Sequence, residues 1–146
     1  MARNRNIWLV CIDLGYKVFD AHFEKFPTRV INTGAAEQSA FDIAIGLALS
    51  GKIPFVYSIT PFLLCRPFEA IRTYINHENI PVKMIGAGRD DDYEHDGFSH
   101  YAGDDREILE PFTSIKKFWP ETKEEMPTLV RQAVYDKTPY YINLTR

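Results

Sequence analysis

The sequence has 146 residues, of which 45% are hydrophobic and 25% are charged, a composition normal for one globular domain spanning residues 1–146. The formal net charge of −3 gives no support for binding to nucleic acid or to an anionic membrane surface. The two cysteines, Cys11 and Cys65, form no CxxC pair and are typical of thiols in a reducing compartment, so we expect a cytoplasmic protein.

The basic start of the chain is followed by a short apolar run, Ile7–Ile12, which ends at Asp13. A run of this length is too short for a signal peptide or a membrane span, and we interpret it as a buried first strand. Further strands are predicted along the chain, and helical periodicity is predicted between them. The expected strands are 7–13, 29–32, 54–59, 82–86, 114–118 and 140–144, and the expected helices are 35–49, 64–77 and one beginning at Thr122.

The clearest predicted helix carries small and apolar residues at three- and four-residue steps and ends at Gly51, a typical C-cap. These residues are Ala36, Ala40, Ile43, Ala44, Leu47 and Ala48. The segment Thr122–Glu125 has the form of a capping box, which predicts the start of the last helix. The stretch Arg89–Gly97 is highly polar without periodicity, and we expect a loop there.

Strands that alternate with helices predict an α/β fold: a single doubly wound parallel sheet with helices on both faces. In such sheets, ligands bind beyond the carboxyl ends of the strands, so the loops after Asn32, Ile59 and Gly86 are the places where a site is expected. In the first of these loops, Gly34 allows close backbone approach and Glu37 lies in the first turn of the next helix. By its position alone, Glu37 could be a site residue or simply an acid that stabilises the N-terminus of a helix, and both interpretations fit equally well.

Several segments together resemble the pyrimidine-binding domain of the transketolase family, in the family's order and spacing from Asp13 to Arg146. The nearest relatives are expected to be transketolases, followed by deoxyxylulose-phosphate synthase and the β subunits of 2-oxo-acid dehydrogenases. The segments are Phe26–Ser39, Ile45–Val56, Phe62 with Arg66–Arg72, Asp96–His100 and Tyr140–Arg146.

The resemblance implies that this chain helps to bind thiamine diphosphate. Glu37 matches the carboxyl group that hydrogen-bonds N1′ of the cofactor's aminopyrimidine and so promotes loss of the proton from the thiazolium ring. Phe62, Cys65 and Phe68 match positions that form the aminopyrimidine pocket. The spacing of these three residues also fits ordinary core packing on a helix, and that alternative stays open.

The resemblance also implies a substrate end. Arg72 matches an arginine that contacts a sugar phosphate, Asp96 an acid that contacts a substrate hydroxyl, and His100 a catalytic histidine that faces the substrate. Arg72 could instead be a solvated arginine paired with Glu69 or Glu78. For Arg66 we favour that solvated interpretation.

The sequence departs from the family pattern before Asp96. Gly88 stands where transketolases usually carry another substrate-facing histidine, and Arg89–His95 replaces a glycine-rich stretch, which suggests an unusual substrate. His22 and His77 are expected at the surface. The same loop offers oxygen and imidazole groups to a metal, but without a recognisable spacing, so we predict no metal site on this chain. The groups concerned are Asp90, Asp91, Asp92, His95, His100, Asp104 and Asp105.

The family's Gly-Asp-Gly…Asn pattern, which holds a divalent metal and the diphosphate, does not occur in this sequence. We therefore expect thiamine diphosphate to be shared with a partner subunit that carries this motif and the Mg²⁺, in a heterodimer or an α2β2 heterotetramer. The expected activity is transfer of a two-carbon ketol unit between sugar-type substrates. A decarboxylase, an acyl-forming synthase or a non-catalytic domain that kept the fold are the alternatives.

Overall fold

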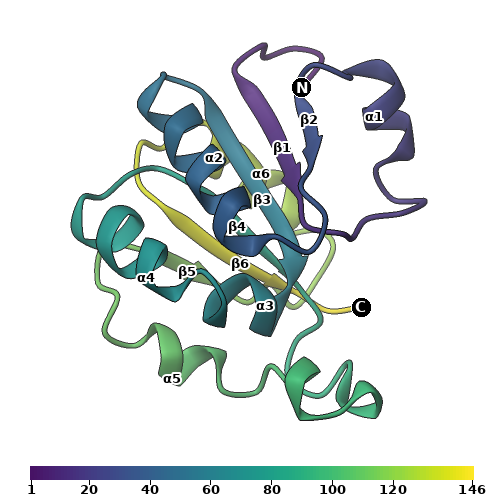
Figure 1. Ribbon diagram of the computed structural model, residues 1–146, viewed down its shortest axis with the longest axis vertical. Helices are drawn as coiled ribbons and strands as arrows, with labels where there is room; N and C mark the ends of the chain where they lie inside the picture. The colour runs from purple at the N-terminus through teal and green to yellow at the C-terminus, as the bar shows by residue number, and fades with distance from the viewer.

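A computed structural model describes all residues from Met1 to Arg146 and is built on one six-stranded, wholly parallel sheet (Figure 1). The strand order is β2-β1-β3-β4-β6-β5. The predicted doubly wound α/β fold is confirmed, and each predicted strand end lies within two residues of an observed one. The strands are β1 (Ile7–Cys11), β2 (Val30–Asn32), β3 (Ile53–Ile59), β4 (Lys83–Ala87), β5 (Lys116–Phe118) and β6 (Tyr140–Leu144).

Helices cover both faces of the sheet, and side chains alternate between these faces along each strand. On β1, Val10 belongs to the core beneath α2, whereas Leu9 and Cys11 pack on the other face with apolar residues from the α1 region. The α-helices are α1 (Asp20–Lys25), α2 (Glu37–Leu49), α3 (Thr60–Cys65), α4 (Phe68–Ala70), α5 (Asp105–Leu109) and α6 (Met126–Tyr135). A π-helical turn, η1 (Ile71–His77), and two 3₁₀ turns, η2 (Glu94–Asp96) and η3 (Phe98–His100), complete the elements.

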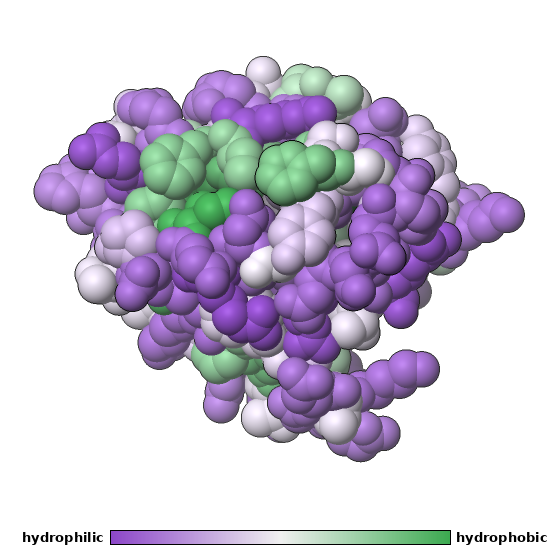
Figure 2. All heavy atoms as spheres, turned by 90° about the horizontal axis from the view of Figure 1, so that it is seen from below, coloured by the Kyte–Doolittle hydropathy of each residue, from purple (hydrophilic) through white to green (hydrophobic).

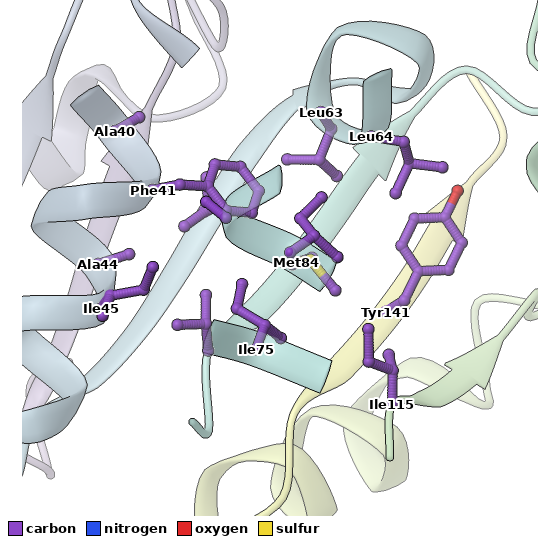
Figure 3. Close-up of a cluster of buried hydrophobic side chains, with 14 of the residues drawn as sticks. Ala40, Phe41, Ala44, Ile45, Leu63, Leu64, Ile75, Met84, Ile115 and Tyr141 are labelled. Carbon is purple, nitrogen blue, oxygen red and sulfur yellow. The ribbon is translucent and has the colours of Figure 1, made fainter. Parts of the chain in front are cut away.

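The main core lies between the sheet and the helices from α2 to α5 (Figure 3). Helix α2 contributes Phe41 and Ile45 as well as the predicted Ala40 and Ala44, whereas Ile43 is exposed. The predicted face was therefore wrong by part of a turn, because the large Phe41 ring takes the core position. Gly51 ends α2 as predicted, with φ of +75°.

The predicted helix 64–77 is the least accurate part of the sequence prediction. In the structure, helix α3 begins at Thr60 and the helical stretch is interrupted at Pro67. The chain then continues through α4 and η1. Proline lacks the N–H of a regular helical hydrogen bond and clashes with the preceding turn, which explains the break. The short helices α1 and α5 were not predicted.

The last helix also begins later than predicted. The Glu125 carboxylate accepts the Thr122 N–H at 2.9 Å, but this contact closes a turn that precedes α6, whose first residue is Met126. The polar segment Arg89–Gly97 is a loop as predicted, apart from the η2 turn. The face seen in Figure 2 is largely polar, and several apolar side chains gather in its upper left part. No helix in the structure is both long enough and apolar enough to cross a membrane.

Candidate functional site

A hollow of about 210 Å³ opens at the carboxyl ends of β1 and β3. The chain leaves β1 towards β2 on one side, whereas β3 pairs with β1 on the other side. Crevices at such a reversal of strand order are the usual ligand sites of doubly wound sheets. The residues lining the hollow are Ile12, Asp13, Leu14, Ala35, Glu37, Ser58, Ile59, Phe62 and Arg66.

The turn between β2 and α2 places Glu37 in this hollow. Gly34 adopts a φ of +64°, which favours glycine, and its N–H donates to the Asn32 side-chain oxygen at 2.9 Å. Helix α2 then begins at Glu37, so the carboxylate lies at the positive end of the helix. Only 7% of the Glu37 side chain is exposed, so this carboxylate is buried in a cavity wall rather than solvated at a helix end.

Phe62, on α3, also lines the hollow, and its ring contacts the side chains of His100 and Arg66. The His100 ring packs edge-on against it, with centroids 4.9 Å apart. The Arg66 guanidinium lies over it, with Cζ 3.8 Å from the ring centroid. The structure therefore brings His100, assigned by the resemblance to the substrate end, next to Phe62, which lines the same hollow as Glu37.

Arg66 was misassigned. The sequence pattern favoured a solvated arginine paired with nearby acids, whereas its Nη1 donates to Glu37 Oε1 at 2.5 Å, across 29 positions of sequence. No local spacing relates the two residues, because the contact joins the first turn of α2 to the residue that follows α3. Ser58, which is buried near the end of β3, also lines the hollow and was not predicted.

The other predicted cofactor residues lie outside the lining. Phe68 is 39% exposed and packs against Phe112, with ring centroids 5.4 Å apart. Cys65 is an exposed free thiol whose pKa is raised by partial burial of the sulfur and by the negative charge of Asp104. Their assignment to the aminopyrimidine pocket stays a prediction.

The predicted substrate residues are dispersed over the surface. Arg72 lies on the η1 turn in a separate shallow hollow, with Thr73, Asn76 and His77. Asp96 is exposed at the end of η2, with an oxygen 3.5 Å from Nε2 of His95. Only His100 of the three borders the Glu37 hollow through Phe62, so the roles of Arg72 and Asp96 stay predictions.

At Gly88, where the resemblance led us to expect a histidine, the structure leaves no room for a side chain. The φ of Gly88 is +79°, and a Cβ atom built there would lie 2.1 Å from the ring of Tyr93. Any side chain at this position would displace Tyr93 and strain the backbone. Gly88 and the position of Tyr93 in the loop therefore depend on each other.

Two acids of the loop, Asp90 and Asp92, bind other groups of the protein, and no three His, Cys, Asp or Glu side chains converge as metal ligands. Asp90 pairs with Arg106 at 3.2 Å. Asp92 accepts the backbone N–H groups of Arg89 and Arg146, which ties the loop to the end of the chain.

Asp105 is buried, and its Oδ2 accepts three hydrogen bonds. The donors are Trp119 Nε1 at 2.7 Å, the Tyr141 hydroxyl at 2.7 Å and Asn143 Nδ2 at 2.6 Å. Burial, followed by the Asp105 charge, raises the pKa of Tyr141 well above its ordinary value. Asn143 in turn accepts from the Thr60 hydroxyl at 3.0 Å, so this network fixes the start of α3 and thereby the platform that carries Phe62.

Comparison with known proteins matches residues 1–146 to the transketolase pyrimidine-binding domain. The chain is 32% identical over 121 residues to one subunit of the apulose-4-phosphate transketolase of Actinobacillus succinogenes, covering 83% of this chain and 39% of that protein. It is 30% identical over 142 residues to a putative transketolase C-terminal section of Methanocaldococcus jannaschii, covering 97% of this chain and 45% of that protein.

A solved structure described as a split-gene transketolase in an inactive β4 tetramer superposes with a TM-score of 0.84 at 30% identity. The match covers 99% of this chain and 47% of the other. This chain therefore spans less than half the length of these three relatives.

Proposed function

Because the chain belongs to the transketolase family, as its pyrimidine-binding domain, we propose that it forms one part of a thiamine-diphosphate-dependent enzyme. The proposed reaction is transfer of a two-carbon ketol unit between sugar-type substrates, as the similarity to a subunit of a sugar-phosphate transketolase suggests. The observation that carries the proposal is the buried Glu37 carboxylate, which opens a helix at the switch point of the sheet and shares a hollow with the Phe62 ring.

The residues of the hollow fit the aminopyrimidine of thiamine diphosphate. This flat ring needs an apolar surface and a carboxylate, and the hollow offers both in Phe62 and Glu37. When bound, the cofactor supplies the nucleophilic carbon that attacks a carbonyl group. Glu37 orients the ring through N1′ and shares the proton there, while the walls formed by Ile12 and Ile59 exclude water from this bond.

His100 is proposed to face the substrate. Its ring borders the hollow through Phe62, and the Ser99 hydroxyl lies 3.1 Å from Nδ1. An imidazole beside Phe62 would lie next to a ring bound in the hollow, and from there it would hydrogen-bond a substrate hydroxyl and exchange a proton with it.

The proposed complex is completed by a second polypeptide that carries the Gly-Asp-Gly…Asn motif, Mg²⁺ and the diphosphate site, in a heterodimer or an α2β2 heterotetramer in the cytoplasm. The description of one relative as a single subunit of its transketolase, and of another as an inactive β4 tetramer, supports the need for such a partner.

The test is calorimetric titration of thiamine diphosphate into the chain alone and into the chain with its partner. We expect micromolar binding and ketol transfer only with the partner present. Micromolar binding and turnover by the chain alone would contradict the divided site. Release of CO₂ without an acceptor would favour the decarboxylase alternative, and cofactor-free assembly would favour a non-catalytic domain.

A further inference from the structure

Arg66 makes the two contacts that the proposed function assigns to the cofactor's ring. Its guanidinium donates to Glu37 Oε1 at 2.5 Å, and the same group lies 3.8 Å from the centroid of Phe62. A guanidinium is planar, carries N–H donors and stacks on aromatic rings. An aminopyrimidine shares the flat shape and seeks the same carboxylate and the same ring face.

We propose that Arg66 is an internal competitor of the aminopyrimidine: it holds Glu37 and covers Phe62 until the ring displaces it. This inference rests on the proposed function, because it assumes that Glu37 and Phe62 bind that ring. It gives Arg66 a positioning role, since the arginine keeps the buried carboxylate paired while the ring is absent.

The burial of the two partners shows which one moves. The Glu37 side chain is 7% exposed and is fixed in the first turn of α2, whereas 48% of the Arg66 side chain is exposed. Glu37 is the only group that accepts a hydrogen bond from the Arg66 side chain. Arg66 directly follows α3, and the next residue is Pro67, so a rotation of its side chain towards solvent disturbs no helical hydrogen bond.

The ion pair with Glu37 and the stacking on Phe62 reduce the fraction of chains in which the hollow is open to the ring. The apparent affinity of the chain for the ring falls in proportion to that fraction. For contacts of this strength, the competition should weaken ring binding by about three- to tenfold. The sign of the change in affinity distinguishes the two roles. Removing a competing arginine tightens binding of the ring, whereas removing an arginine that contacts the ligand weakens it.

The probe is 4-amino-5-hydroxymethyl-2-methylpyrimidine, the ring fragment without diphosphate, titrated into the whole chain by NMR. Arg66→Met retains the apolar stem and removes the guanidinium, so it should bind the fragment about three- to tenfold more tightly than the wild type. Arg66→Gln should do the same. Arg131→Met, at an exposed arginine on α6, is the matched control and should leave the affinity unchanged.

Two further measurements separate this inference from the proposed function. Without any ligand, Glu37→Gln should shift the guanidinium signals of Arg66, and with the fragment it should weaken binding. If Glu37→Gln weakens binding but both Arg66 variants bind no more tightly than the wild type, the competition is refuted and the proposed function stands. Absence of fragment binding in every variant, including both Arg66 variants, would overturn the competition, whereas the proposed function is decided by the titration with the partner present.

Discussion

Replacing Asp105 with alanine should destabilise the protein strongly, because three donors converge on one oxygen of this buried carboxylate. Trp119, Tyr141 and Asn143 all donate to Oδ2, at 2.6–2.7 Å. Tyr141 and Asn143 are fully buried, so neither can replace the lost acceptor with water. Trp119 is only partly buried and can recover part of its hydrogen bonding from solvent.

The magnitude follows from these contacts. Two buried donors left without an acceptor cost about 1–3 kcal/mol each. The carboxylate itself is costly to bury, since Oδ1 has no hydrogen-bond partner and the nearest cation, Arg106, is 3.9 Å away. Removal of the charge relieves that cost in part, so we expect a net loss of about 2–4 kcal/mol for Asp105→Ala. Asp105→Asn retains an oxygen acceptor and should lose about 1 kcal/mol.

The assay is urea unfolding of the wild type and both variants, with Asp104→Ala as the control at an exposed neighbouring acid. The control should change the free energy of unfolding by less than about 0.5 kcal/mol. A loss below about 1 kcal/mol for Asp105→Ala, or equal losses for alanine and asparagine, would refute the argument that acceptor geometry at Oδ2 sets the stability.

The remaining predictions concern the site and its surroundings. In the assembled enzyme, Glu37→Gln should lower turnover by about a hundredfold or more without preventing assembly, and near wild-type turnover would contradict the assignment. Phe62→Ala should weaken cofactor binding by about 1–3 kcal/mol in a calorimetric titration, whereas unchanged affinity would make Phe62 a packing residue. His100→Ala and Arg72→Ala should alter KM or kcat and leave cofactor affinity nearly unchanged. A hydrogen bond from Lys116 holds the pKa of Asp136 at about 2, so its contribution to stability should be present above about pH 4 and lost towards pH 2; thermal unfolding of Asp136→Asn should not show this loss.

The sheet was well predicted from the sequence because buried parallel strands are short apolar runs that tertiary contacts rarely override. The strand β6 was predicted with its observed ends, Tyr140–Leu144. The position of Glu37 was also accessible, because a glycine followed by a helix start is a local pattern. The break at Pro67 was visible in the sequence but was not used, which caused the error in the helix 64–77.

The contacts that define the hollow were not accessible from the sequence. Arg66 and Glu37 are 29 positions apart, and nothing in either segment indicates the other. The Asp105 network joins residues up to 83 positions apart, because it extends through Asn143 to Thr60, and its acid had been grouped with the surface loop. Such contacts depend on how elements pack on the sheet, and local periodicity does not carry that information.

The charges around the hollow bear on the proposed division of the cofactor site. Among its nine lining residues, Asp13 and Glu37 are acidic and Arg66 is the only base. Because Arg66 already pairs with Glu37, the lining presents no free cation to an anion, and Asp13 would repel one. The neutral aminopyrimidine is suited to these walls, whereas the diphosphate needs a metal and oxygen ligands. This asymmetry supports the placement of the diphosphate end outside the hollow, against the partner proposed above, and it predicts that the ring fragment and thiamine diphosphate bind the isolated chain with similar, weak affinity.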